Sequence, residues 1–322
     1  MPVLQPEPVR KLSLDDLELK HLVDQKSGSG EQDKPDASDL DVDDWVLANV
    51  RAALELGFAG VILSGPPGTG KSWYAQQVAV ALTGDWESVR SVQFHPSYQY
   101  EDFVFGYQSN DGGVFTPTAK EFVNACRAAA LHPDRPYVLV IDEISRSDVV
   151  RVFGEALTYL EQDKRDRPFV TAMGEELVVP RNLIVLGTMN PWDKGVDELD
   201  AALERRFAQI DLLPDPERLR QIVNAAGAQE PFLSRLITFF EALQAESFER
   251  VRLGHAYFLK CIDEPSATNV WSLRLKPTLR RACSLDPAML GRIEQRWAQV
   301  VPEPSQPDLP VGDEQTGGVA SQ

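Results

Sequence analysis

The sequence is poor in the residues that build disulfide frameworks and metal centres. It has three cysteines and four histidines among 322 residues. Three cysteines cannot form a disulfide framework, no C-x-x-C pair is present, and the histidines do not have the spacing of metal ligands. We therefore expect reduced thiols, as in a cytoplasmic protein, and no metal site built on cysteine or histidine.

Basic residues are also in short supply. The chain has 32 Lys and Arg against 49 Asp and Glu, which gives a net charge of -17. A chain with this charge repels nucleic acid unless its few basic residues are clustered. We therefore do not expect this chain to bind DNA directly.

Long hydrophobic runs are absent as well. A helix that spans a bilayer needs about 20 consecutive apolar residues, and no stretch approaches that length. The N-terminal residues have no apolar signal core. These absences predict a cytoplasmic protein without a membrane partner.

What the sequence does contain is a regular alternation of apolar strands and helical segments. Hydrophobic residues make up 43% of the chain, which is enough for a large core. The expected strands are 60–64, 89–94, 136–143, 182–189 and 207–213, and the expected helices between them are 42–57, 71–84, 118–132 and 149–162. Apolar runs separated by helices predict an α/β fold with a parallel sheet covered on both faces.

The pattern changes after this α/β part. Only helical segments follow, at 215–227, 231–246, 254–262 and 288–300. We therefore predict four parts in sequence order: a flexible polar leader over 1–40, an α/β domain over 41–213, a small all-helical domain over 214–300 and a disordered acidic tail over 301–322.

The motif GPPGTGKS follows the first expected strand and opens the next helix, which is the context that a P-loop requires. Glycines let the backbone wrap phosphate groups with its N–H groups pointing inward, and the helix N-terminus adds favourable charge. Lys71 can reach the β- and γ-phosphates, and Ser72 can bind Mg²⁺. The predicted nucleotide-binding residues here are Gly65, Pro66, Pro67, Gly68, Thr69, Gly70, Lys71 and Ser72.

An acidic pair ends another expected strand, in YVLVIDEIS. Asp142 stands where α/β folds place ligands, and we expect it to contact Mg²⁺ through water. Glu143 is suited to polarise an attacking water.

The stretch GTMNPWDK raises a question of specificity, because Asn190 and Asp193 have the N-x-x-D spacing with which Ras-like GTPases read guanine. The adjacent Arg205 and Arg206 follow soon after. A P-loop, an acidic pair, a strand-end Asn, an Arg pair and a helical domain, in that order, resemble the AAA+ ATPases. The resemblance implies that Asn190 is their first sensor, which orients the attacking water. Asp193 then braces the loop, and guanine reading is kept as the alternative.

Four stretches narrow this resemblance. FHPSYQYEDFVFGY (94–107), IDEISRSDVVRVFGEALTYLEQDKR (141–165), GTMNPWDKGVDELDAALERRF (187–207) and LGHAYFL (253–259) look like the McrB-like subfamily, the motor subunits of modified-cytosine restriction systems. That subfamily groups with the dynein-related and MoxR-like AAA+ proteins. The resemblance covers 44–300.

The resemblance carries several expectations. It implies an AAA+ core followed by a helical lid, ATP and Mg²⁺ as ligands, and a homo-oligomer, expected to be a hexameric ring. Arg205 or Arg206 would reach the γ-phosphate on the neighbouring subunit as an arginine finger.

The sequence also departs from the subfamily. Ser145 stands where members usually have Asn, and PWDK replaces the frequent Thr-Ala-Asp-Arg. The namesake of the subfamily prefers GTP, whereas we expect ATP here, with GTP as the alternative. The leader is too short and too polar for the modified-base-reading domain of that namesake, so we expect a partner to recognise the target.

The functional expectation is an ATPase that couples hydrolysis to remodelling or translocation for a separate effector, such as a nuclease. The alternatives are a GTP-specific McrB-like motor and a MoxR-like chaperone or scaffold that nucleotide switches.

Four smaller features complete the expectations. The aromatic residues of 94–107 are expected to pack against the sheet edge rather than stack on bases. A hairpin is expected within 168–182, lining a ring pore or forming a surface insertion. His255 is assigned no chemistry, and either Arg252 or Arg274 could act as a second sensor.

Overall fold

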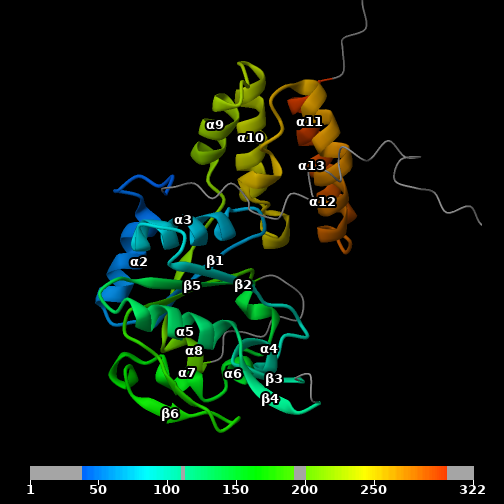
Figure 1. Cartoon of the computed structure of the whole chain (residues 1–322). Coiled ribbons are helices and arrows are strands. Elements are labelled where there is room, and N and C mark those ends of the chain that lie inside the picture. The colour runs from blue at the N-terminus through cyan, green and yellow to red at the C-terminus, as the bar shows by residue number, and fades with distance from the viewer. Residues whose placement is uncertain (1–37, 110–112, 192–200, 303–322) are drawn as a thin grey trace, which may run out of the picture.

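The computed structural model describes residues 38–109, 113–191 and 201–302. The α/β part occupies the lower half of Figure 1 and the helical part the upper half. Most of the predicted leader and nearly all of the predicted tail, 1–37 and 303–322, lie outside the described residues. The predicted flexibility of those two parts is therefore untested.

A five-stranded sheet forms the centre of the α/β part (Figure 1). Its strands lie in the order β2-β5-β8-β1-β9, and every neighbouring pair is parallel. This confirms the predicted parallel sheet. The strands are β1 (Gly60–Ser64), β2 (Val89–Gln93), β5 (Tyr137–Asp142), β8 (Leu183–Met189) and β9 (Phe207–Asp211).

Both faces of the sheet are buried, because alternate side chains of each strand enter different cores. Val61 and Leu63 join the core beneath helices α2 (Trp45–Glu55) and α3 (Lys71–Thr83). Ile62, between them, joins the core on the opposite face.

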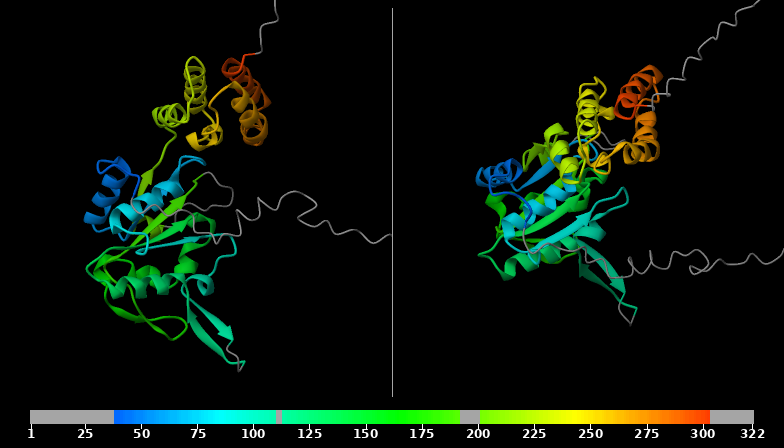
Figure 2. Two further views of the ribbon diagram at one scale, coloured as in Figure 1. Left: turned by 45° about the horizontal axis from the view of Figure 1, so that its top comes forward. Right: turned by 90° about the horizontal axis from the view of Figure 1, so that it is seen from above.

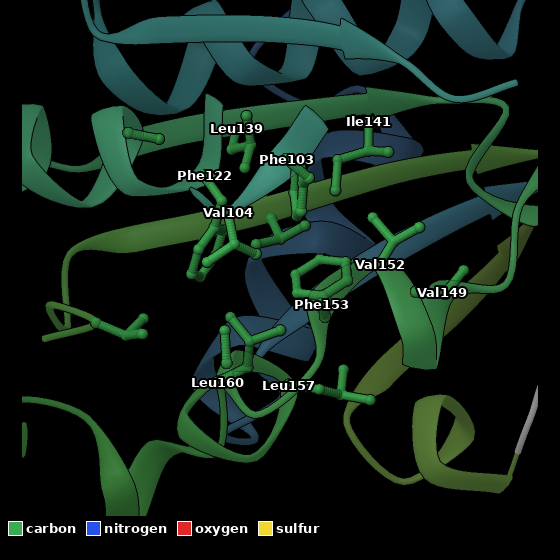
Figure 3. Close-up of a cluster of buried hydrophobic side chains, with 14 of the residues drawn as sticks. Phe103, Val104, Phe122, Leu139, Ile141, Val149, Val152, Phe153, Leu157 and Leu160 are labelled. Atoms are coloured by element: carbon green, nitrogen blue, oxygen red, sulfur yellow. The ribbon is translucent and has the colours of Figure 1, made fainter. Parts of the chain in front are cut away.

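Figure 3 shows part of that second core. The rings of Phe103, Phe122 and Phe153 pack together there, with centroids 4.8 to 5.5 Å apart. Leu139 and Ile141 of β5 cover them from the sheet. The helices of this face are α5 (Glu121–Leu131), α6 (Val149–Phe153) and α7 (Ala156–Tyr159).

The single helix predicted over 149–162 is wrong. The chain forms α6 and α7 with a break at Gly154, and a 3₁₀ turn (Gln162–Lys164) follows. Gly154 has φ +54°, and a Cβ atom there would lie 2.9 Å from the Tyr100 ring. The break therefore lies at a glycine whose backbone conformation few other residues adopt, and the Tyr100 ring leaves no room for a side chain there.

The helix predicted over 118–132 begins later, because 118–119 belong to a strand. After the short helix α4 (Tyr100–Phe103), β3 (Phe105–Ser109) pairs antiparallel with β4 (Phe115–Ala119). This hairpin was not predicted, and it projects from the body of the molecule in Figure 2. Phe94 is 1% exposed, and Phe103 and Phe105 are also buried, so these three aromatic residues pack as expected. Tyr107 does not, because it is 57% exposed.

The hairpin expected within 168–182 is present. Strands β6 (Pro168–Val170) and β7 (Glu176–Val178) pair antiparallel. A short helix, α8 (Ala201–Glu204), precedes β9.

From 216 to 302 the structure contains only helices and turns. The α-helices are α9 (Pro216–Ala225), α10 (Phe232–Gln244), α11 (Glu264–Val270), α12 (Lys276–Ala282) and α13 (Pro287–Val300), with a π-helical turn (Trp271–Leu275) between α11 and α12. They share a separate hydrophobic core, in which the Trp271 and Trp297 rings stack with centroids 4.7 Å apart. The domain division at 213/214 stays a prediction.

One predicted helix of this part is wrong. Segment 254–262 forms only a 3₁₀ turn (His255–Tyr257), while α11 and α12 were not predicted. The cause is that this segment bonds to the α/β part, as described below. None of the helices in the described ranges is long and apolar enough to cross a bilayer.

Candidate active site

The register of the sheet brings the predicted site residues to one edge. Ser64 at the end of β1 pairs with Met189 of β8 and Asp211 of β9. The P-loop follows Ser64, and Asn190 follows Met189. Ile141 pairs with Gly187, so Asp142 ends β5 at the same edge. Parallel strands therefore gather three motifs that are far apart in the sequence.

The P-loop backbone adopts conformations that glycine permits and other residues seldom adopt. Gly68 and Gly70 have φ +83° and +86°, which is left-handed backbone. Gly70 is the residue immediately before α3, and no side chain caps that helix. The Thr69 hydroxyl and the Lys71 ammonium group donate to the Pro66 carbonyl at 3.1 and 2.9 Å. Lys71 is therefore held against the loop, beside the N-terminus of α3, where an anion is favoured.

Asp142 is at the centre of a hydrogen-bonded cluster. Its Oδ1 accepts hydrogen bonds from the hydroxyls of Ser72 at 2.8 Å and Thr188 at 2.5 Å. The Thr188 hydroxyl in turn accepts from the backbone N–H of Glu143 at 3.0 Å. The structure thus brings the two predicted magnesium-site residues together. A hydroxyl and a carboxylate are hard oxygen ligands that fit Mg²⁺.

Thr188 was missed by the sequence reasoning. It lies one step before the end of an apolar strand, and only the pairing of β5 with β8 shows what it contacts. Its position two residues before Asn190 is the signal that could have drawn attention to it.

Glu143 has an unusual backbone. Its φ and ψ are 56° and 42°, in the left-handed region that residues other than glycine seldom adopt. Such conformations cost free energy and concentrate at functional sites. The turn directs the chain from β5 into a 3₁₀ turn (Ile144–Arg146), and Arg146 Nε lies 3.3 Å from the Glu143 carboxylate.

Asn190 is 7% exposed at the end of β8. The N–H of Gly65 donates to the Met189 carbonyl at 3.2 Å, which fixes this strand end against the P-loop. Asp193 lies outside the described residues, so the structure does not test the guanine-reading alternative.

The helical part of the chain makes backbone hydrogen bonds to the P-loop. The backbone N–H groups of Gly254 and Ala256 donate to the carbonyls of Pro67 and Gly68 at 3.0 and 2.9 Å. A Cβ atom at Gly254 would lie 2.1 Å from Gly68, so only glycine permits this approach. The LGHAYFL stretch is thus a docking segment, and its glycine is the signal that sequence reasoning left unused.

His255 lies in this docking segment, with Nε2 3.6 Å from the position that a Gly70 Cβ would occupy. It is 8% exposed, and its Nδ1 atom has no hydrogen-bond partner in the part of the chain described. Burial, followed by the charge of Arg218, lowers the pKa of His255. The imidazole is therefore packed, as expected, but it is packed beside the P-loop.

A cavity of about 1000 Å³ lies between the P-loop, the end of β8 and the helical part. Its lining includes Pro67, Asn190, Phe248, Arg250 and Arg281. Its position beside the P-loop makes it the space into which a bound ligand would extend.

The two arginines considered as second sensors each have a contact within the helical part, and their role stays a prediction. Arg252 donates two hydrogen bonds to the Glu246 carbonyl, at 3.0 and 2.9 Å. Arg274 lies over the Tyr257 ring, 4.7 Å from its centroid.

The Arg pair separates into one buried and one exposed side chain. Arg206 is 5% exposed and donates to the Ala202 carbonyl at 2.6 Å. The Arg205 side chain is 65% exposed. Both guanidinium groups contact Glu161. Arg205 is therefore the member of the pair whose side chain is exposed to contact with another molecule.

Comparison with known proteins agrees with this geometry. The AAA domain of the dynein-related subfamily matches residues 60–207, from the start of β1 to the start of β9. The chain is 36% identical over 215 residues to the Type IV methyl-directed restriction enzyme EcoKMcrB subunit of Escherichia coli (strain K12), covering 62% of this chain and 47% of that protein. This chain is an AAA+ protein that is similar to the McrB-like subfamily.

A second relative of this AAA+ chain is the Type II restriction enzyme BsuMI component YdiS of Bacillus subtilis (strain 168). It is 25% identical over 188 residues, covering 46% of this chain and 55% of that protein. The chain spans about half the length of these two relatives.

We predict that Thr188→Val impairs nucleotide turnover while nucleotide binding persists. The change removes the hydroxyl that joins Asp142 to the Glu143 backbone, and small displacements of catalytic groups cost up to about 100-fold in rate. Turnover at saturating nucleotide should fall about 10- to 100-fold, with the Kd of a fluorescent nucleotide analogue changed less than about threefold.

The matched control is Thr171→Val. Thr171 is also buried, and its hydroxyl donates to the Glu175 carbonyl at 2.9 Å in the β6–β7 hairpin. Equal loss of turnover in both variants would assign Thr188 a general structural role.

Proposed function

We propose that this McrB-like AAA+ chain hydrolyses ATP within a ring of identical subunits and uses turnover to remodel or translocate a target for a separate effector protein. The observation that supports this most directly is the cluster of Ser72, Asp142 and Thr188 beside the P-loop. It joins the phosphate cradle to the acidic pair, as coupled binding and hydrolysis require.

The residues divide into two groups by role. The P-loop N–H groups and Lys71 hold the phosphates, and Ser72 and Asp142 hold Mg²⁺, which neutralises phosphate charge when it is bound. Glu143 then accepts a proton from the attacking water, and Asn190 orients that water. Each group lies at the carboxyl edge of the sheet, where one ligand can meet them all.

A role in a multi-protein system follows from the relatives. Two of them are named as a subunit and a component of restriction enzymes. This supports a restriction-type system in which this chain supplies the ATPase and another protein, for example a nuclease, acts on the target. A MoxR-like scaffold that nucleotide switches is the alternative outcome of the experiments below.

The first test separates binding from hydrolysis. Lys71→Ala should abolish nucleotide binding, because it removes the cation that reaches the β- and γ-phosphates. Glu143→Gln should bind nucleotide normally and stop turnover, because a neutral amide cannot accept the proton. Calorimetric titration and phosphate release measure the two properties. Equal loss of binding in both variants would contradict this division of roles.

A second test concerns the nucleotide. Asn190 is assigned to the water that attacks the γ-phosphate, which leaves no assigned residue for reading guanine, so ATP should compete better than GTP for the site. Displacement of a fluorescent analogue by each nucleotide gives the ratio. A clear preference for GTP would restore the guanine-reading role of Asp193, and Asp193→Ala would then reduce that preference.

The third test concerns the ring. We propose Arg205 as the finger, since Arg206 is buried and bonded within its own subunit. Arg205→Ala should fold and bind nucleotide but lose about 10³- to 10⁵-fold in rate. Mixing it with Lys71→Ala protein should restore part of the activity, because a mixed interface pairs an intact P-loop with an intact finger.

Two observations together would contradict an arginine finger supplied by a neighbouring subunit. Turnover per subunit that does not depend on protein concentration, together with no recovery on mixing, would leave a monomeric switch. Light scattering on the same mixtures reports whether rings form.

A further inference from the structure

Three basic side chains converge on one carboxylate, that of Glu161. Its Oε2 lies 2.6 Å from Lys164 Nζ, and its Oε1 lies 3.1 Å from Arg205 Nη2 and 2.5 Å from Arg206 Nη2. These contacts, led by the hydrogen bond with Lys164, lower the pKa of Glu161, so the group stays ionised. Glu161 lies within the 141–165 stretch that carries the McrB-like resemblance, but sequence reasoning assigned it no role.

The two arginines depend on Glu161 to different degrees. A buried cation without a counter-ion is strongly unfavourable, and the Arg206 side chain is only 4% exposed. Arg205 is largely exposed, where an ion pair contributes little. Glu161 therefore fixes Arg206 firmly and holds Arg205 weakly.

The backbone next to Glu161 is itself rigidly placed. Arg165 is 2% exposed and donates hydrogen bonds to the carbonyls of Leu160, Pro180, Leu183 and Ala59. The first of these acceptors is the neighbour of Glu161, and the others lie at or near the starts of β8 and β1. Glu161 is thus attached to the amino edge of the central strands.

These contacts connect two distant parts of the chain. Glu161 follows α6 and α7, which continue from the acidic pair, whereas Arg205 and Arg206 lie between α8 and β9. We propose that Glu161 is the positioning residue of the arginine finger: it fixes Arg206, and through it the adjacent backbone, so that Arg205 is presented to the neighbouring subunit. This rests on the proposed function, in which Arg205 acts in trans.

The exposed contact explains how Arg205 could be released. The triphosphate of a neighbour carries more negative charge than one carboxylate, so Arg205 can exchange Glu161 for phosphate while Arg206 stays paired. Glu161 is a positioning group and touches no reacting atom in this scheme.

The test uses mixtures of two variants and introduces Glu161→Gln into only one of them at a time. Arg205→Ala protein supplies the P-loop, and Lys71→Ala protein supplies the finger. Adding Glu161→Gln to the Lys71→Ala subunit should lower the recovered kcat about 10- to 100-fold, because the donated finger is misplaced. Adding it to the Arg205→Ala subunit should leave the recovered kcat within about twofold, because that subunit has no finger to position. KM should be unchanged in both mixtures.

Lys164→Ala in the finger-donating subunit is the matched control. It removes one cation from Glu161 but leaves both arginine contacts, so the recovered kcat should stay within about twofold.

Each outcome has a distinct meaning. Equal loss of recovery with Glu161→Gln in either subunit, or no loss in the finger-donating subunit, would overturn the positioning role of Glu161. No recovery in the parent mixture of Arg205→Ala and Lys71→Ala would instead contradict the finger in trans, and so the proposed function. If circular dichroism shows that the Glu161→Gln variant is unfolded, the Glu161→Asp variant replaces it. Aspartate keeps the negative charge but has a shorter side chain, so the expected outcomes are the same.

Discussion

The site depends on the hydrogen bonds that Asp142 accepts from two hydroxyls. Ser72 opens the helix after the P-loop, and Thr188 lies on β8, so one carboxylate ties the β1–α3 connection to β5 and β8. The second bond of Thr188, from the Glu143 N–H, sets the turn that leaves β5. A shift of any of these strands would therefore move the phosphate cradle relative to Glu143.

The same loop is constrained from its other side by the helical part. Gly254 and Ala256 donate to P-loop carbonyls, so the loop that cradles phosphate is also a docking surface for the lid. A phosphate bound at the proposed site would therefore contact the same short segment of backbone as the helical part. In the proposed function, this arrangement would transmit the state of the nucleotide to the lid without a separate linker.

The arginines show why exposure matters when a role is assigned. The sequence presents Arg205 and Arg206 as equivalent neighbours, whereas the structure buries one and exposes the other. Their shared partner, Glu161, comes from a segment about 45 residues earlier in the chain, and its place is fixed by the hydrogen bonds of Arg165. The placement of the proposed finger therefore depends on contacts across the whole α/β part.

The sequence determined those features that rest on local pattern. Apolar runs between helices were enough to predict the parallel sheet, and GPPGTGKS after a strand was enough to place Lys71 and Ser72. Both features depend on a few consecutive residues, because the conformational freedom of glycine and the burial of a strand are local properties of the sequence. Gly84 also ends α3 where the pattern placed its end.

Tertiary structure decided everything that depends on contacts between distant segments. The lack of room for a side chain at Gly154 follows from the Tyr100 ring, the contacts of Thr188 from strand pairing, and the docking of His255 from bonds to the P-loop. The burial of Arg206 belongs to the same group. The hydrophobic periodicity of the sequence cannot reveal these features, because each depends on a contact with a residue far away in the chain and not on its sequence neighbours.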